Sequence, residues 1–241
     1  MPVTTRHQAA NGIVLGTLID RSGSMEDMNP IETANSINHV IREQSEQGDI
    51  TYYGGSFDSH YTMFLEGAKA PIREITVEDI QPRGITALYS AIGNFITDIS
   101  TNAPTGVKVV IVILTDGMNN SHPDEWTKSS VKQLITNKRE QDNWEFIFMG
   151  ANQDAVLVGN DLGISKNSSV TYSSNSQGIK TALRCMSDAV TRTRNGKDAE
   201  VEFTQEERFE SNVVDVDEQT DFRSPRRSFA NSPTVEESQS Y

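Results

Sequence analysis

The sequence predicts an α/β fold, with a doubly wound, mostly parallel sheet of about six strands and helices on both faces. Three observations support this prediction. Short apolar runs that suit buried strands alternate with segments of helical hydrophobic spacing. Two of the runs, residues 13–19 and 108–114, lead into aspartates, as expected where strands end at a ligand-binding edge. The 241 residues, 35% of them hydrophobic, are enough for one sizeable core.

The first half of the chain is predicted to form a buried strand, a helix and an antiparallel hairpin at the edge of the sheet. Residues 13–19 are almost continuously apolar, which is typical of a strand buried on both faces of a parallel sheet. Asn29 is a suitable cap for a helix that has Pro30 at its first position. Residues 49–57 and 61–65 are rich in Thr, Tyr and Phe and are separated by three turn residues, which predicts an antiparallel hairpin.

The second half continues the alternation of strands and helices. Residues 108–114 form the most β-branched run and therefore predict a strand in the middle of the sheet, next to residues 13–19. Acidic residues at 124 and 125 suit the positive end of a helix. The other expected elements are a helix over 86–99, a strand over 144–149, a short helix over 154–162, a strand over 169–172 and a helix over 176–194.

Three segments are expected from these patterns. Residues 1–11 are polar and predict a flexible N-terminus, and residues 12–195 form the domain. After residue 195 the periodicity stops, and residues 196–241 hold 12 acidic and 5 basic side chains with few apolar ones. Such a composition cannot bury enough apolar surface to offset its ordering entropy, so we expect an acidic, disordered tail.

The composition also excludes several classes of function. A net charge of −13 argues against nucleic-acid binding, which requires a surplus of Lys and Arg. No apolar run approaches the roughly 20 residues of a membrane-spanning helix. The polar N-terminus lacks a secretory signal and the single Cys185 allows no internal disulfide, so we expect a soluble, cytoplasmic protein. Cys185 itself lies on an apolar helical face and predicts core packing.

Oxygen-bearing side chains gather in three loops that the predicted sheet brings to one edge. The loops supply two carboxylates and three hydroxyls, and hard oxygen ligands with few carboxylates suit Mg²⁺, with Mn²⁺ or Ca²⁺ as alternatives. A cage of low charge leaves positive charge for an incoming Asp or Glu carboxylate. The candidate ligands are Asp20, Ser22, Ser24, Thr86 and Asp116.

The three loops resemble the metal-ion-dependent adhesion site of von Willebrand factor A-type (vWA) domains. DRSGSM follows the first strand, GITALYSAI opens a helix and VVIVILTDG ends the central strand, in the order found in that family. The resemblance covers residues 13–194 and points to a microbial or phage-like member. It implies a Rossmann-like fold, with direct metal ligation by Ser22, Ser24 and Thr86. Asp20 and Asp116 would then act directly or through water.

The resulting hypothesis is a protein-binding module that depends on a divalent metal and is not an enzyme. An Asp or Glu carboxylate of the partner would complete the coordination shell of the metal. Its oligomeric state stays open. A second hypothesis is a Mg²⁺-dependent phosphatase-like enzyme of the haloacid dehalogenase type, although such enzymes need a second acid where this chain has Ser22. A third is a metal-free structural component of a bacterial or phage assembly. In that case the five side chains would only cap helices and form turns.

Overall fold

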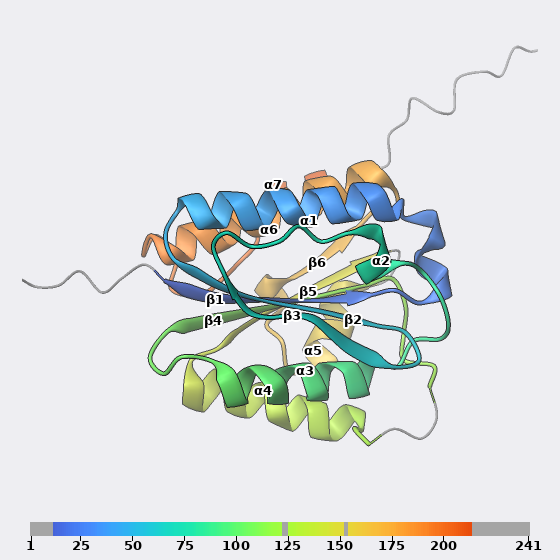
Figure 1. Cartoon of the computed structure of the whole chain (residues 1–241), viewed down its shortest axis with the longest axis horizontal. Coiled ribbons are helices and arrows are strands. Elements are labelled where there is room, and N and C mark those ends of the chain that lie inside the picture. The colour runs from blue at the N-terminus through green and yellow to red at the C-terminus, as the bar shows by residue number, and fades with distance from the viewer. Residues whose placement is uncertain (1–11, 122–124, 152–153, 214–241) are drawn as a thin grey trace, which may run out of the picture.

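A six-stranded sheet lies between two layers of helices in the computed structural model, which describes residues 12–121, 125–151 and 154–213. Figure 1 shows α1, α6 and α7 on one side of the sheet and α3, α4 and α5 on the other. The predicted α/β class is confirmed. Residues 1–11, predicted to be flexible, lie outside the described part.

The elements follow one another as the alternation predicts. The strands are β1 (Ile13–Asp20), β2 (Ile50–Phe57), β3 (Tyr61–Lys69), β4 (Lys108–Thr115), β5 (Glu145–Ala151) and β6 (Ser169–Tyr172). The α-helices are α1 (Pro30–Glu46), α2 (Val77–Ile80), α3 (Leu88–Asn102), α4 (Lys128–Asp142), α5 (Ala155–Asp161), α6 (Ser176–Arg194) and α7 (Gln205–Ser211). Two 3₁₀ helices, η1 (Gly23–Asp27) and η2 (Lys166–Ser168), complete the described elements.

Strand order places β1 and β4 side by side in the middle of the sheet, as predicted. The order is β3-β2-β1-β4-β5-β6, and β3 is antiparallel to β2 while the other pairs are parallel. Ile13 lies opposite Lys108 and Ile19 opposite Leu114, so the two strands end at the same level. The residues that follow them therefore meet at the carboxyl edge of the sheet.

Side chains of each strand alternate between two separate cores. On β1, Leu15 and Ile19 pack beneath α1 and α6, whereas Val14 and Leu18 pack against the α3 layer. This division follows from the two-residue period of a strand, and it explains why the apolar runs are continuous. Cys185 of α6 is fully buried in the first core, as predicted.

Local signals account for most helix starts, with one correction. The Asn29 side chain accepts hydrogen bonds from the first turn of α1, at 3.0 Å from the amide nitrogen of Ile31. The helix expected to open at residues 124 and 125 instead begins at Lys128, because the Thr127 hydroxyl caps it and accepts from the Ser130 amide. Residues 122–124 lie outside the described part.

The segment that follows α6 corrects the predicted domain boundary at residue 195. Val201 and Phe203 are buried in the first core, and α7 packs on α6. An ion pair of 2.7 Å between Arg192 Nη1 and Glu207 Oε1 fixes α7 to the end of α6. Residues up to 213 therefore belong to the domain. The remainder of the predicted tail, residues 214–241, lies outside the described part.

Truncating Phe203 tests this packing. Because its ring is only 6% exposed, Phe203→Ala is expected to lower the free energy of unfolding by about 3 kcal/mol. Phe209→Ala is the matched control, since that ring on α7 is 74% exposed and its loss is expected to cost less than about 0.5 kcal/mol. Urea denaturation measures both. Equal small losses would show that residues 196–213 do not pack on the domain in solution.

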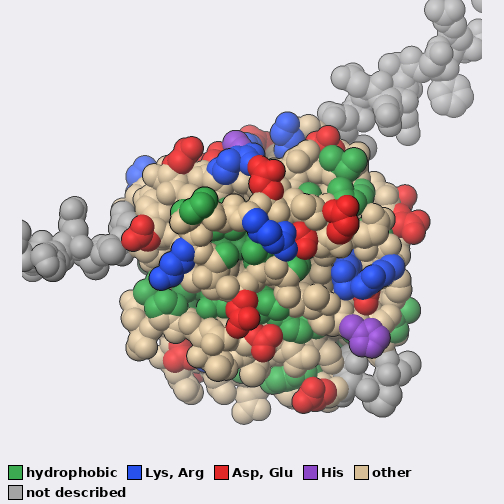
Figure 2. All heavy atoms as spheres, viewed as in Figure 1, with side chains coloured by type: hydrophobic (Ala, Val, Ile, Leu, Met, Phe, Trp, Pro, Cys, Tyr) green, Lys and Arg blue, Asp and Glu red, His purple; other side chains and the backbone are tan. Residues whose placement is uncertain are grey.

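Two further features concern the helices and the surface charge of the described residues. None of the described helices is long and apolar enough to cross a bilayer. Figure 2 shows acidic and basic side chains intermingled over one face of the molecule.

Candidate metal site

Three loops converge at the carboxyl edge of β1 and β4. The first runs from β1 through η1, the second precedes α3 and the third follows β4. The Gly23 amide donates to the Gly84 carbonyl at 3.2 Å, which joins the first loop to the second. Asn120 joins the second to the third, because its side-chain oxygen accepts from the Thr86 amide at 2.7 Å. Hydrogen bonds within the protein thus hold the three loops together without a ligand.

Asp20 forms the floor of the site and is only 1% exposed. Its Oδ1 accepts from the Ser22 amide at 2.8 Å, and its Oδ2 accepts from the Thr115 hydroxyl at 2.6 Å. The carboxylate therefore folds the first loop back on itself and links it to β4. It turns the two serines of that loop toward Asp116.

A row of side-chain oxygens lies above this floor. Ser22 Oγ is 3.1 Å from Ser24 Oγ, and Ser24 Oγ donates to Asp116 Oδ1 at 2.7 Å. Neighbouring ligands of an octahedral Mg²⁺, each about 2.1 Å from the ion, are about 3.0 Å apart. The oxygens already have the separations of one coordination shell, so this donor set fits a small divalent ion.

Thr86 brings a third hydroxyl to the same place. Its residue is 2% exposed, and a Cβ atom added at Gly117 would lie 3.5 Å from Thr86 Oγ1 and 3.8 Å from Ser24 Oγ. Both hydroxyls therefore face Gly117, where the absence of a side chain leaves room. The loop reaches this position through Gly84, whose φ of +70° is strained for other residues.

Both site carboxylates are held in surroundings that disfavour their charge. Burial raises the pKa of Asp20 to about 6, against lowering by hydrogen bonds from Thr115 and Ser22, and Asp116 adds a smaller upward effect. Burial also raises the pKa of Asp116, with a contribution from Asp27, while the Ser24 hydroxyl lowers it. A cation between the two carboxylates would relieve this cost.

The raised pKa of Asp20 predicts an unusual pH dependence for the metal-free protein. The ordinary pKa is 3.8, so between about pH 4 and 6 the folded state keeps a proton that the unfolded state has lost. The contribution of Asp20 to the free energy of unfolding is fully present below its pKa in the unfolded state. It is lost as the pH rises through its pKa in the folded state, and the total loss is up to about 3 kcal/mol. Thermal melts in EDTA measure it. Asp20→Asn should remove this fall, and an equal fall in that variant would contradict the assignment.

An ion-pair network beneath the loops was not anticipated from the sequence. Asp58, 4% exposed, lies 3.0 Å from Arg21 Nε, without hydrogen-bond geometry, and accepts a hydrogen bond from Arg83 Nε at 2.7 Å. The Asp58 carbonyl also accepts from the Ala87 amide at 2.9 Å. Asp58 therefore supports the first loop and the loop that carries Thr86.

The structure brings all five sequence-predicted residues to one site. Within the described ranges no cluster of three or more His, Cys, Asp or Glu side chains could hold a metal, so a hydroxyl-rich set with two carboxylates remains the candidate. Sequence reasoning missed the supporting residues Thr115, Asn120 and Asp58. Thr115 stands directly before Asp116, but nothing in the sequence shows that its hydroxyl reaches Asp20.

Comparisons with known proteins show the fold and go no further. No family model and no curated protein sequence matches the chain. Among solved structures it is similar to proximal thread matrix protein 1 from the mussel byssus, at 14% identity and a TM-score of 0.57 over 77% of this chain and 47% of that one. A von Willebrand factor type A protein from Catenulispora acidiphila matches at 14% and 0.57, over 75% of this chain and 43% of that one.

A third match is the PilB minor pilin from Streptococcus sanguinis, at 11% identity and a TM-score of 0.58 over 80% of this chain and 63% of that one. The chain spans less than two thirds of each of these three structures. The vWA-like fold predicted from the sequence is therefore confirmed, while the activity is a separate question.

Proposed function

We propose that this chain is a protein-binding module that holds one divalent metal ion at the carboxyl edge of its sheet. The observation that carries this proposal is the row of oxygens from Ser22 through Ser24 to Asp116, with separations of 3.1 and 2.7 Å. Thr86 completes the direct ligands, and Asp20 holds the first loop from below. The oxygen donors favour Mg²⁺, with Mn²⁺ and Ca²⁺ as alternatives.

The exposure of the ligands supports a partner that binds on top of the site. Asp20, Ser22 and Thr86 are buried, whereas Ser24 is exposed and Asp116 is half-buried. The open side of the site thus faces solvent. When bound, the ion supplies positive charge that two carboxylates incompletely screen, and an Asp or Glu of a partner is the natural further ligand.

We propose binding without turnover. A phosphotransfer enzyme with an aspartate nucleophile at Asp20 needs a second acid two residues later, and Ser22 occupies that position. Asp20 is also almost completely buried and both of its oxygens accept hydrogen bonds, so it is poorly placed to attack a substrate. The vWA-like fold of the similar structures is compatible with this role but does not decide it.

Replacing Ser24 tests the metal half of this proposal. Ser24→Ala removes one neutral ligand from an exposed position, so we expect Mg²⁺ affinity to fall at least about tenfold while the melting temperature in EDTA stays unchanged. Ser36→Ala, at a half-buried position of α1, is the control variant. Isothermal titration calorimetry measures both. Wild-type Mg²⁺ affinity in Ser24→Ala would count against the site.

The same variant tests the partner half. A protein captured by the wild-type chain in Mg²⁺ is expected to be lost in EDTA and lost with Ser24→Ala, and retained with Ser36→Ala. Capture that survives both EDTA and Ser24→Ala would show binding through another surface.

A further inference from the structure

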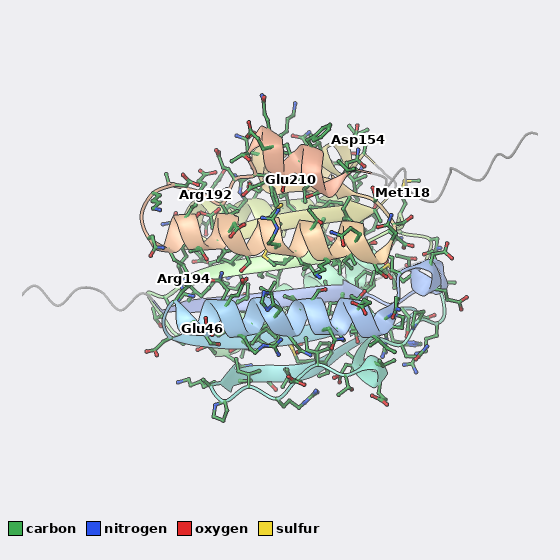
Figure 3. All side chains as sticks on the ribbon, turned by 90° about the horizontal axis from the view of Figure 1, so that it is seen from above. Glu46, Met118, Asp154, Arg192, Arg194 and Glu210 are labelled. Carbon is green, nitrogen blue, oxygen red and sulfur yellow. The ribbon has the colours of Figure 1, made fainter. Side chains whose placement is uncertain are left out.

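Two exposed apolar side chains flank the loops of the proposed metal site. Ile85 is 47% exposed and directly precedes Thr86, and Met118 is 73% exposed and comes two residues after Asp116. Figure 3 shows Met118 at one end of the molecule and Glu46 at the other. Exposed apolar side chains beside a polar site are typical of a surface that a protein partner covers. The rim of the site therefore offers a partner more than a metal ion.

The loop that carries Ile85 lies directly against the first loop of the site. The Arg83 amide donates to the Arg21 carbonyl at 2.7 Å, and the Gly23 amide donates to the Gly84 carbonyl at 3.2 Å. Gly23 stands between the two serines that are candidate ligands, so residues 83 and 84 run beside them. A side chain exposed at position 83 is therefore part of the rim of the metal site.

The guanidinium group of Arg83 is a cation that the fold neutralises only in part. Asp58 Oδ2 lies 2.7 Å from Arg83 Nε and 3.0 Å from Arg21 Nε, so one carboxylate faces two guanidinium groups. The side chain of Arg21 is 7% exposed, whereas that of Arg83 is 65% exposed. Arg83 therefore presents the excess positive charge to solvent. Among the described residues its Nη atoms have no hydrogen-bond partner, which leaves them for a carboxylate from outside.

We propose that the partner segment presents two carboxylates and an apolar side chain to this rim. One carboxylate completes the coordination shell of the metal, the second binds the Nη atoms of Arg83, and the apolar side chain covers Ile85 and Met118. This inference rests on the proposed function. Guanidinium and carboxylate groups pair through two parallel hydrogen bonds, so Arg83 recognises a second acid by its geometry as well as by its charge.

The second contact makes the site selective among acidic partners. Most protein surfaces carry exposed Asp and Glu, so a carboxylate that completes a metal shell distinguishes few of them. A charge pair at the rim of an interface raises the association rate and its dependence on salt, while a covered apolar side chain slows dissociation. Segments with one isolated acid therefore bind more weakly and leave sooner than segments with two acids and an apolar residue.

Parallel selections from one displayed library of random peptides test the proposal. In Mg²⁺ the wild-type chain is expected to enrich peptides that combine two acidic residues with an apolar one. Arg83→Gln removes the second charge contact, so its enriched peptides are expected to keep only one acid. Arg42→Gln is the matched control, because that arginine of α1 is 57% exposed and pairs with one acid, Glu74, at 3.0 Å. It should enrich the same peptides as the wild type.

The double variant Ile85→Ser with Met118→Ser tests the apolar contact in the same selection. Both side chains are exposed, so the exchange leaves the core intact. Its enriched peptides should keep both acids and lose the preference for an apolar residue. An unchanged preference for apolar residues would overturn this part of the proposal.

One peptide enriched by the wild type provides the affinities. Fluorescence polarisation in Mg²⁺ is expected to show binding about tenfold weaker for Arg83→Gln. Exchanging the second acid of the peptide for its amide should weaken binding to the wild type by the same factor. The exchange should leave binding to Arg83→Gln unchanged, because both changes remove one contact. Additive losses would overturn the pairing of this acid with Arg83.

The remaining outcomes separate this inference from the proposed function. Peptides with one acid from both the wild type and Arg83→Gln, recovered in Mg²⁺ and lost in EDTA, would overturn the inference alone. A basic residue beside the acid would assign the preference to the exposed Glu26 and Asp27 and would also overturn it. Equal recovery in Mg²⁺ and in EDTA, or no enrichment in either, would overturn the proposed function as well.

Discussion

Replacing Asp20 with asparagine is expected to weaken Mg²⁺ binding more than about 100-fold and, at neutral pH, to stabilise the metal-free protein. The loss of affinity follows because the carboxylate both supplies charge and orients Ser22, and even outer partners of metal ligands are worth about 10- to 100-fold. The gain in stability follows because burial already raises the pKa of Asp20 to about 6, so its charge opposes folding above that pH.

Calorimetric titration with Mg²⁺ and a thermal melt in EDTA at pH 7.5 measure the two halves. The two effects have opposite signs, and this distinguishes the two roles. Replacing a residue that only shaped a turn would lower the stability of the metal-free protein and would leave its Mg²⁺ affinity unchanged. An asparagine variant that melts lower in EDTA and binds Mg²⁺ normally would show that Asp20 has a structural role.

Removing Asp58 is expected to have the largest effect on stability. Asp58→Ala leaves the guanidinium of Arg21, with its side chain 7% exposed, as a buried charge without its partner. Breaking a buried pair in this way costs about 3–5 kcal/mol in the free energy of unfolding. The control is Arg83→Ala, because that side chain is 65% exposed and its pairing with Asp58 contributes less than about 1 kcal/mol.

Urea denaturation compares the two variants. We also expect Asp58→Ala to weaken Mg²⁺ binding where it remains folded, since the Asp58 carboxylate accepts a hydrogen bond from Arg83 in the loop that carries Thr86. Equal losses in the two variants would indicate that solvent compensates the Arg21 charge and that the network does not support the site.

The sequence was sufficient to predict the sheet and the convergence of the five candidate side chains because their signals are local. An apolar run that ends at an aspartate identifies a central strand and the start of its loop together, and both β1 and β4 have this form. Parallel pairing then requires the two ends to meet. The capping signal at Asn29 and the turn between β2 and β3 are equally local, and the structure has both.

The supporting contacts could not be predicted because they join residues far apart in the chain. Thr115 reaches Asp20 across 95 positions, and Asn120 reaches Thr86 across 34. Arg21 of the first loop is likewise buried, and its partner Asp58 belongs to the turn between β2 and β3. These pairings depend on strand order and register, and a single sequence does not display them.

The segment after α6 was misjudged for a related reason. Its composition is polar and acidic, and among its described residues the apolar side chains of Val201 and Phe203 reach the core. Glu207 is one of the acidic side chains counted there, yet it pairs with Arg192 and caps α7 by accepting a hydrogen bond from the Thr204 amide at 2.8 Å. Average composition therefore predicted disorder where buried side chains and ion pairs, among them those of Arg192 with Asp198 and Glu207, hold the chain on the domain.

The central claim is that the five residues at the carboxyl edge form one divalent-metal site, and an anomalous difference map tests it most directly. Crystals of the full-length chain soaked in Mn²⁺ and measured near the manganese absorption edge locate the ion without assumptions about its ligands. The account predicts one strong peak within bonding distance of the hydroxyls of Ser22, Ser24 and Thr86, with Asp20 and Asp116 bound directly or through water. No peak at this edge, or a stronger one at the exposed acids Glu26 and Asp27, would contradict it.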